Sequence, residues 1–411
     1  MQETHEYAVG IDIGTTTIRC VVGHIDTASG TPTIVGVGQS PNSGMRKGVV
    51  VNLAGPAKAI DDALGEAERM SGYQVDEATI SINGSHIMST RADGMIAVGG
   101  ADHEIILEDI DRIEEVSTTG KIPANREIIE IVPHSYSLDG QENIKDPIGM
   151  TGTRLEIKAN VVSVLEPHFV NLQKAAEMAK VSPHAIIPAG IAAAKAVLSE
   201  QQLENGVALI DIGGATSNVA VFEEGDLQYI AVIPVGGVNI TNDLAIGLKT
   251  DPEIAEKVKI SHVNLNNRSE KDYIQIKHNK ESYDFDSKDI EEIVEARLDE
   301  IFDAISQELK KAGCDGSLPN GVVLTGGTAN LKGLDDFAKQ KLGVAARIGK
   351  ASGYAGVADH IEEPQFASVI GLMLSDLQSD NNTNHQSKSN NKKKVKAVSG
   401  FLKNFFSRFK A

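Results

Sequence analysis

Two short segments of the chain place a carboxylate at the end of an apolar run and follow it with a turn of small residues. They read Asp12-Ile13-Gly14-Thr15-Thr16-Thr17 and Asp211-Ile212-Gly213-Gly214-Ala215-Thr216. Glycine permits close backbone approach, turn N–H groups and threonine hydroxyls can donate to phosphate oxygens, and aspartate can hold the water shell of Mg²⁺. Strand–Asp–Gly hairpins without a ligand are common, so one copy alone would be weak evidence for a phosphate site.

A third glycine-rich segment strengthens this interpretation. Gly326 and Gly327 follow an apolar strand expected at Gly321–Leu324, and the next residues open a predicted helix. The glycines would let the backbone lie against a flat purine, and the helix amides would point toward phosphate or ribose. Alone, this segment would be an ordinary strand-to-helix loop. Taken together, the three segments give a candidate site that comprises Asp12, Gly14, Thr15, Thr16, Asp211, Gly213, Gly214, Thr216, Gly326, Gly327 and Ala329, with Asp12 and Asp211 holding Mg²⁺ through water.

The elements around the two aspartates follow one plan. Each aspartate ends an apolar β-branched run and is followed by a second such run, which predicts a β-hairpin with a Gly/Thr turn. Because the copies lie far apart, they indicate two related lobes, and 411 residues exceed what one hydrophobic core usually holds. The predicted hairpin strands are Tyr7–Asp12 with Ile18–Val22 and Val207–Asp211 with Val219–Phe222.

Alternating strand and helix patterns predict an α/β fold with an inserted subdomain. The insertion has its own helix at Glu108–Ser117 and strands at Ile128–Tyr136 and Leu155–Val164. Other helices are expected at Pro56–Ser71, His168–Lys180, Ala189–Ser199 and Ile290–Ala312. The predicted division is a first-lobe core at 7–84 and 165–199, an inserted α+β subdomain at 85–164, a second-lobe core at 200–231 and 313–378, a small subdomain at 232–312, a flexible linker at 379–391 and a terminal amphipathic helix at 392–411.

Charge separates the body of the chain from its last residues. From Asn381 onward there are eight Lys/Arg and no Asp/Glu, while the preceding residues carry the other 31 basic residues and all 57 acidic ones. An acidic body argues against wrapping nucleic acid, and a basic end favours an anionic surface such as a membrane. No apolar run is long enough to span a bilayer and no export signal is evident, so we expect the cytoplasm. The two cysteines, Cys20 and Cys314, have no metal-site spacing.

The last twenty residues, KKKVKAVSGFLKNFFSRFKA, form an amphipathic pattern. Successive steps of 100° gather seven apolar side chains on one arc, with lysines such as Lys396 and Lys403 opposite. These residues follow a polar, Asn/Ser-rich stretch, which makes a core helix the weaker interpretation. An interfacial membrane helix is favoured, and a partner-binding helix stays open. The predicted membrane-contacting residues are Val395, Val398, Phe401, Leu402, Phe405, Phe406 and Phe409.

The order of the three glycine-containing motifs resembles the phosphate-1, phosphate-2 and adenosine motifs of the actin, sugar-kinase and heat-shock-chaperone superfamily. Within it, the segments Ile82–Ile96, Ile128–Val162 and Val232–Ala245 resemble the FtsA family of bacterial cell-division actins. The resemblance implies two lobes of actin-like, ribonuclease H-like fold with ATP and Mg²⁺ in the cleft between them. It also implies that Glu256 and Lys259 lie on the helix that clasps ribose and adenine, although a solvated charge pair is the usual fate of such residues.

The resemblance also implies partners and a location. The implied partners include other copies of the chain in a filament, anionic inner-membrane lipid, and later division proteins, which would bind the inserted subdomain. A further implied partner is the C-terminal peptide of the tubulin-like protein FtsZ, which would bind the small subdomain with Arg297 at a contact position. The place of action would be the cytoplasmic face of the membrane at the division septum.

One departure bears on turnover. Hydrolysing bacterial actins have Glu-Pro where this chain has Ile187-Pro188, and actin's water-orienting glutamine would fall near Lys195. Neither side chain can accept a proton from water, so we expect ATP binding and at most slow hydrolysis. Two alternatives stay open, a pilus-assembly actin and a small-molecule kinase of the same superfamily. The kinase is less favoured because no candidate base for the substrate hydroxyl is evident.

Overall fold

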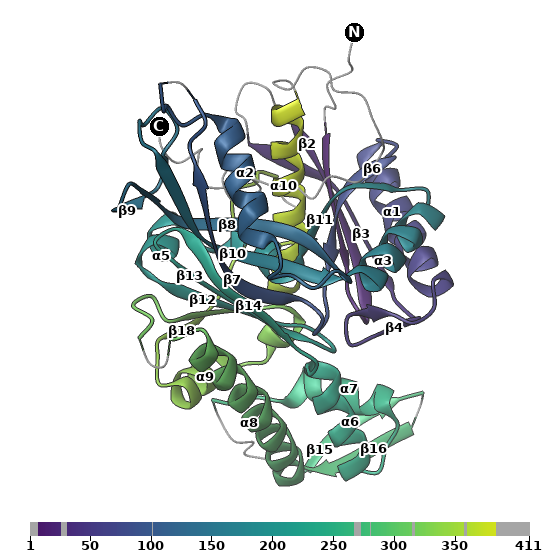
Figure 1. Cartoon of the computed structure of the whole chain (residues 1–411). Helices are drawn as coiled ribbons and strands as arrows, with labels where there is room; N and C mark the ends of the chain where they lie inside the picture. The colour runs from purple at the N-terminus through teal and green to yellow at the C-terminus, as the bar shows by residue number, and fades with distance from the viewer. Residues whose placement is uncertain are drawn as a thin grey trace.

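The computed structural model describes residues 7–25, 31–100, 102–266, 273–279, 281–314, 317–356 and 360–383, with side chains as far as Leu377. Two lobes lie one above the other, with an inserted subdomain beside the first and a small subdomain at the far end of the second (Figure 1). The predicted membrane helix at 392–411, with its seven apolar contact residues, lies outside the described residues. Within the described ranges, no helix is both long and apolar enough to cross a membrane.

The first lobe is built on a five-stranded sheet in the order β11-β6-β1-β2-β3. Strand β1 runs antiparallel to β2, with Asp12 opposite Arg19, and parallel to β6. Helix α1 packs against β3 on one side of the sheet, and α10 packs against β1 and α4 on the other (Figure 1). The elements are β1 (Tyr7–Ile13), β2 (Thr17–Ile25), β3 (Pro32–Pro41), β4 (Met45–Arg46), β5 (Val49–Val50), α1 (Ala54–Ser71), β6 (Glu77–Ile82), α3 (Glu166–Met178), β11 (Ser182–Pro188), α4 (Ala189–Val197) and α10 (Ala367–Thr383).

The second lobe repeats this plan with the order β14-β13-β12-β17-β18. Strands β12 and β13 form an antiparallel hairpin, and β12 runs parallel to β17. The two predicted hairpins and the internal repeat are therefore confirmed. The elements are α5 (Glu200–Asn205), β12 (Val207–Ile212), β13 (Ser217–Glu223), β14 (Asp226–Ile233), β17 (Val322–Thr325), the 3-10 helix η1 (Gly327–Asn330), α9 (Leu334–Leu342), β18 (Ala346–Ile348) and the 3-10 helix η2 (Pro364–Phe366).

The small subdomain comprises three helices and a two-stranded ribbon that share a hydrophobic core with one face of the second sheet. Its longest helix, α8, buries a regular stripe that includes Ile290, Val294, Leu298 and Ile305, while charged residues cover the other sides. That spacing is the 3.6-residue period of an amphipathic helix. The elements are α6 (Gly237–Gly247), α7 (Pro252–His262), β15 (Tyr273–His278), β16 (Glu281–Asp286) and α8 (Ser287–Lys311).

The inserted subdomain has its own sheet, in the order β7-β10-β8-β9, and its own core around Ile113, Leu155 and Ile157. It docks on the second lobe at β14. Lys145 Nζ lies 2.9 Å from Asp226 Oδ2, and Asn160 donates to the carbonyl of Leu227 at 3.2 Å. The elements are β7 (Met88–Ala97), α2 (Leu107–Thr118), β8 (Arg126–Leu138), β9 (Gln141–Ile144) and β10 (Arg154–Leu165).

Helix α10 packs in the first lobe, whereas the division predicted from the sequence places it in the second. That division groups residues 313–378 with the second lobe, but Val369, Leu372 and Met373 pack in the core of the first lobe. Asp376 fixes this position because its carboxylate accepts from the backbone of Val9 at 2.8 Å and from Thr79 Oγ1 at 2.7 Å. The helix also continues to Thr383, past the start of the predicted linker.

Candidate nucleotide site between the lobes

The turns of the two Asp-Gly hairpins meet across the lobes. A Cβ placed on Gly214 would lie 2.7 Å from Thr16 Oγ1, so only glycine permits this approach. The second turn is closed by a hydrogen bond from Gly213 N to Thr216 O at 2.9 Å. Asn83, which follows β6 of the first lobe, donates from its side chain to Thr216 Oγ1 at 3.2 Å. Residues predicted for phosphate binding from two distant segments are thus brought together.

Asp12 is oriented by a serine on the neighbouring strand. Ser81 donates to Asp12 Oδ1 at 2.8 Å and accepts from the backbone N–H of Ile13 at 2.8 Å. Burial raises the pKa of Asp12, while the charge of Arg19 and the serine hydrogen bond oppose that rise. A carboxylate held in this way, with a raised pKa, favours a cation beside it because the charge is poorly solvated.

Asp211 occupies the equivalent place in the second lobe. Its Oδ2 accepts from Asn218 Nδ2 at 3.0 Å, and the side-chain carbonyl oxygen of Asn218 is buried with no hydrogen-bond partner among the described residues. Burial first, and then the charge of Asp12, raise the pKa of Asp211 to about 7. The two carboxylates are therefore close enough to affect each other's ionisation, which is the arrangement that a divalent cation relieves.

Arg19 is a candidate site residue that the sequence reasoning missed. It lies opposite Asp12 in the β1–β2 register, and its guanidinium lies 5.4 Å from the centre of the Phe366 ring. Its Nε is buried, and no described residue pairs with it. Burial lowers the pKa of Arg19, whereas Asp12, Asp211 and Glu363 counteract this shift. An arginine inside the apolar strand TIRCVV was the available signal.

The third glycine segment borders the same space. Gly326 has a φ of +85°, and a Cβ there would lie 2.3 Å from Asp211 Oδ1, so this turn requires glycine. A Cβ on Gly327 would meet nothing within 4 Å, which leaves open space beside the backbone. Thr328 Oγ1 donates to Gly213 O at 3.2 Å and joins this segment to the second hairpin. The helix predicted here is the single turn η1.

Ala329 differs from the other residues of this segment. Its side chain is buried in the core of the second lobe and its backbone N–H bonds to Gly326 O at 3.0 Å. The structure therefore gives Ala329 a packing role beside the glycines.

Glu256 and Lys259 form a network next to this segment. Lys259 is buried, and its Nζ lies 2.7 Å from Glu256 Oε2, 2.8 Å from Thr241 Oγ1 and 3.1 Å from Gly237 O. A Cβ on Gly237 would lie 2.5 Å from Thr328 Oγ1, so the network and the adenosine-like segment are neighbours. The solvated-pair interpretation does not hold for Lys259, because a lysine is rarely so deeply buried without a specific set of partners.

The structure shows the surroundings of Ile187, which bears on turnover, and of Arg297, the predicted partner contact. Ile187 is buried, and across β11 and β6 it pairs with Ser81, the residue that donates to Asp12. Arg297 donates from Nη2 to Asp243 Oδ1 at 3.0 Å, and this bond braces α8 against α6. Arg297 also pairs with Glu300 of its own helix. A partner that used Arg297 would have to share its guanidinium with these carboxylates.

The residues present fit a nucleotide with a divalent cation. Asp12 lies opposite the half-buried Arg19 in the β1–β2 register, threonine hydroxyls and glycine backbone lie at both hairpins, and open space lies beside Gly327. Asp12 and Asp211 would hold the cation through water, and Arg19 with the hairpin amides would contact phosphate.

Two lobes that each carry such a hairpin define the actin-like class of α/β proteins. Solved structures of that class agree: the PilM–PilN type IV pilus biogenesis complex superposes with a TM-score of 0.66 over 90% of this chain and 98% of the other, at 15% identity. MreB5 of Spiroplasma citri bound to ADP gives 0.57 over 93% of this chain and 99% of the other, at 14% identity. At such identities, the likeness concerns the fold alone.

Sequence comparison identifies the family. The model described as "Cell division protein FtsA" matches residues 208–371, and "SHS2 domain inserted in FTSA" matches residues 84–163. The chain is 34% identical to the cell division protein FtsA of Pseudomonas aeruginosa, over 90% of this chain and 89% of that protein. It is 30% identical to that of Borreliella burgdorferi, over 97% of each. The chain belongs to the FtsA family of cell division proteins.

Proposed function

We propose that the chain binds ATP with Mg²⁺ in the cleft between the lobes and uses the nucleotide as a ligand for assembly. The packing of the two Asp-Gly hairpins against each other, with Gly214 against Thr16 and Arg19 opposite Asp12, is the observation that carries this proposal. The likeness in fold to MreB 5 of Spiroplasma citri, solved bound to AMPPNP, supports it. Ile187 beside Ser81 offers no acceptor for a water proton, which favours slow turnover.

The second part of the proposal concerns attachment. The chain would polymerise on the inner face of the cell membrane, hold the FtsZ division ring there, and recruit later division proteins through the inserted subdomain. Its membership of the FtsA family and the basic amphipathic pattern at 392–411 support this role. The likeness to MamK, solved as a double helical filament, supports self-assembly. The FtsZ C-terminal peptide would bind the small subdomain near Arg297.

Residues 392–411 would act as the membrane anchor. The apolar arc can enter the headgroup boundary, and each lysine near an anionic surface adds about 1 kcal/mol of attraction. One such helix binds reversibly, but polymerisation would place many helices on one surface and so raise the effective concentration.

Vesicle co-sedimentation tests the anchor. A chain that ends after Asn391 keeps every described element, so it should bind ATP as the full chain does and fail to sediment with anionic vesicles. Phe405→Glu should have the same effect, and Lys396→Gln with Lys403→Gln should weaken sedimentation mainly at low salt, where screening is least. If the shortened chain sedimented as the full chain does, the anchoring role would be rejected.

A further inference from the structure

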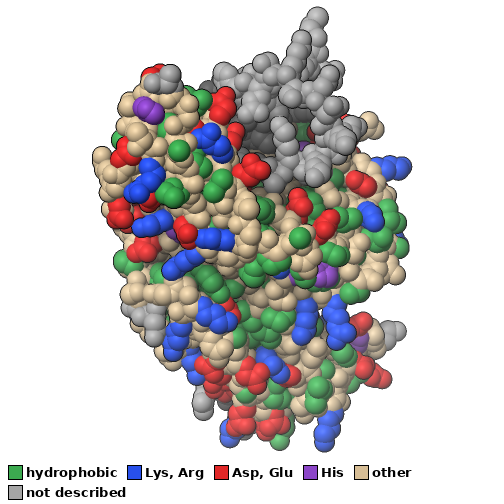
Figure 2. Space-filling model, in the orientation of Figure 1, with side chains coloured by type: hydrophobic (Ala, Val, Ile, Leu, Met, Phe, Trp, Pro, Cys, Tyr) green, Lys and Arg blue, Asp and Glu red, His purple; other side chains and the backbone are tan. Residues whose placement is uncertain are grey.

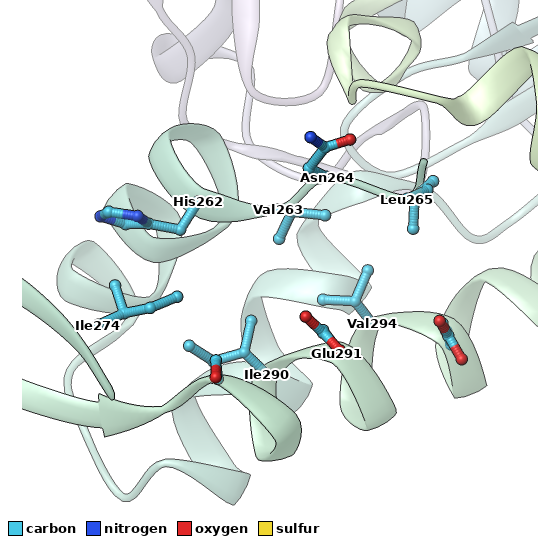
Figure 3. A pocket seen from close by; sticks show the side chains of 10 residues that line it. His262, Val263, Asn264, Leu265, Ile274, Ile290, Glu291 and Val294 are labelled. Atoms are coloured by element: carbon cyan, nitrogen blue, oxygen red, sulfur yellow. The ribbon is translucent and has the colours of Figure 1, made fainter. Parts of the chain in front are cut away.

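A groove lies in the small subdomain between the end of α7 and the first half of α8, away from the nucleotide site (Figure 3). Figure 3 shows the side chains of Val263, Ile274, Ile290 and Val294 directed toward one common space. All four are buried by the subdomain's own packing, and Leu265 at the groove edge is half-buried. The floor of the groove is therefore aliphatic.

The wall of the groove along α8 is acidic. Glu291 and Glu295 line it, one helical turn apart on the same side of the helix. The neighbouring surface of α8 carries Asp289, Glu292, Asp299, Glu300 and Asp303. Two cations pair with acids there: Arg297 bonds to Asp243 and Glu300, and Lys341 of α9 lies 2.5 Å from Asp299. Figure 2 shows Asp and Glu side chains gathered on this end of the molecule.

An aliphatic floor with an acidic wall fits a segment that has apolar side chains on one side and cations on the other. The chain carries one segment of that chemistry, residues 392–411, in which Phe401, Leu402 and Phe405 share an arc with lysines opposite. We propose that this terminal segment docks in the groove between α7 and α8 when no membrane is present.

A long stretch of chain joins α10 to the proposed occupant. Seventeen residues lie between Thr383, the end of α10, and Phe401, so the connection has eighteen Cα–Cα steps. At about 3.3 Å per residue, an extended chain of that length reaches about 60 Å. The occupant is this chain's own terminal segment, and the complementary charges would orient it with its apolar arc toward the groove floor.

Docking would make membrane attachment conditional. The apolar arc can be buried in the groove or in lipid but not in both, so the groove competes with the membrane for one surface. Anionic lipid shifts the balance because it supplies a larger apolar phase and the same attraction for lysine. This consequence rests on the proposed membrane anchor, whereas the docking itself does not.

Peptide binding tests the docking without lipid. The protein is the chain ended after Asn391, whose three hydrophobic cores all lie before that point. A fluorescein-labelled peptide of residues 392–411 is titrated with it, and anisotropy should show saturable binding with a Kd below about 100 µM. A scrambled peptide of the same composition, and the peptide with Phe405→Glu, should bind at least about tenfold more weakly.

Groove variants separate docking from general attraction to an acidic protein. Glu291→Lys with Glu295→Lys should weaken peptide binding about tenfold, because the two changes reverse the charge of the groove wall. The matched control is Asp289→Lys with Glu292→Lys, which makes the same charge change at exposed positions of α8 outside the groove lining and should alter binding less than about threefold. Unchanged ATP affinity of both variants would show that they fold.

Vesicle binding of the full chain gives the second readout. The full chain with the groove changes should reach half-sedimentation at several-fold less anionic lipid than the full chain with the control changes, which shares its net charge. The inference is overturned if the terminal peptide does not bind, if the control pair loses as much binding as the groove pair, or if the FtsZ C-terminal peptide takes the groove while the terminal segment does not. If residues 392–411 are not the membrane anchor, the chain that ends after Asn391 will still sediment with vesicles. That result is separate from the peptide titration, which contains no lipid.

Discussion

Asn83 of the first lobe donates a hydrogen bond from its side-chain amide to the hydroxyl of Thr216 in the second lobe, at 3.2 Å. Asn83 follows the strand whose Ser81 holds Asp12, and Thr216 belongs to the turn that follows Asp211. The bond thus connects the supports of the two carboxylates. A nucleotide that contacts both hairpins would find the lobes already held at a fixed separation.

Asn83→Ala should loosen this connection. Loss of the side-chain hydrogen bonds to Thr216 and to the backbone N–H of Gly84 should lower the free energy of unfolding by about 1–2 kcal/mol, and Mg-ATP affinity should fall several-fold because the hairpins are less well positioned. Urea unfolding and calorimetry measure the two effects. Gln228→Ala, which removes an amide bond to Glu223 O within the exposed β13–β14 hairpin, serves as the control. Equal ATP affinity in Asn83→Ala and the control would contradict this role.

Asp12→Ala and Asp211→Ala should each weaken Mg-ATP binding at least about tenfold, because each change removes an anionic acceptor for the hydrated cation. Neither should unfold the protein, since burial penalises both charged carboxylates in the nucleotide-free chain. Isothermal calorimetry with Mg-ATP is the measurement. Asp93→Ala, an exposed carboxylate paired with Lys121, should bind as the unchanged protein does. Unchanged affinity in both cleft variants would remove the nucleotide assignment.

The raised pKa of Asp211 predicts a pH dependence of stability. Its pKa is about 7 in the folded chain and 3.8 in its ordinary state, so between these values the unfolded chain loses a proton that the folded chain keeps. The contribution of Asp211 to the free energy of unfolding is therefore full below pH 4, falls by up to about 1.4 kcal/mol per pH unit as pH rises toward 7, and is constant above that.

Asp211→Asn isolates this contribution. Urea unfolding of the nucleotide-free proteins at several pH values between 5 and 8 should show that the unchanged protein loses stability relative to Asp211→Asn as pH rises to about 7. Mg-ATP should reduce the difference, because a bound cation favours the ionised carboxylate. Parallel stability curves for the two proteins would show that Asp211 ionises normally.

Turnover of bound ATP should be slow. Ile187 is buried beside Ser81, and an aliphatic side chain cannot position water. Phosphate release should therefore stay well below about 1 per second, the lower end of ordinary enzyme rates. A coupled phosphate assay on the full chain, with Asp211→Ala as the background control, checks this. Release at 1 per second or faster would refute the prediction.

The sequence alone determined the features that depend on neighbours along the chain. Both Asp-Gly hairpins, the inserted subdomain and the long helix α8 could be predicted because strand period, turn residues and helix period are local properties. The glycines at 213, 214 and 326 could be predicted as close-approach positions for the same reason. Residues 392–411 stay a sequence prediction, since they lie outside the described residues.

Only the tertiary structure decided which distant groups meet. Arg19 faces Asp12 and Asp211 because the β1–β2 register and the packing of Phe366 bring it there, and α10 belongs with the first lobe because Asp376 bonds to Val9 and Thr79. Ala329 turns into a core that residues of α8 and α9 help to build. Such contacts depend on burial and charge shared between segments hundreds of residues apart, which no local pattern of residues records.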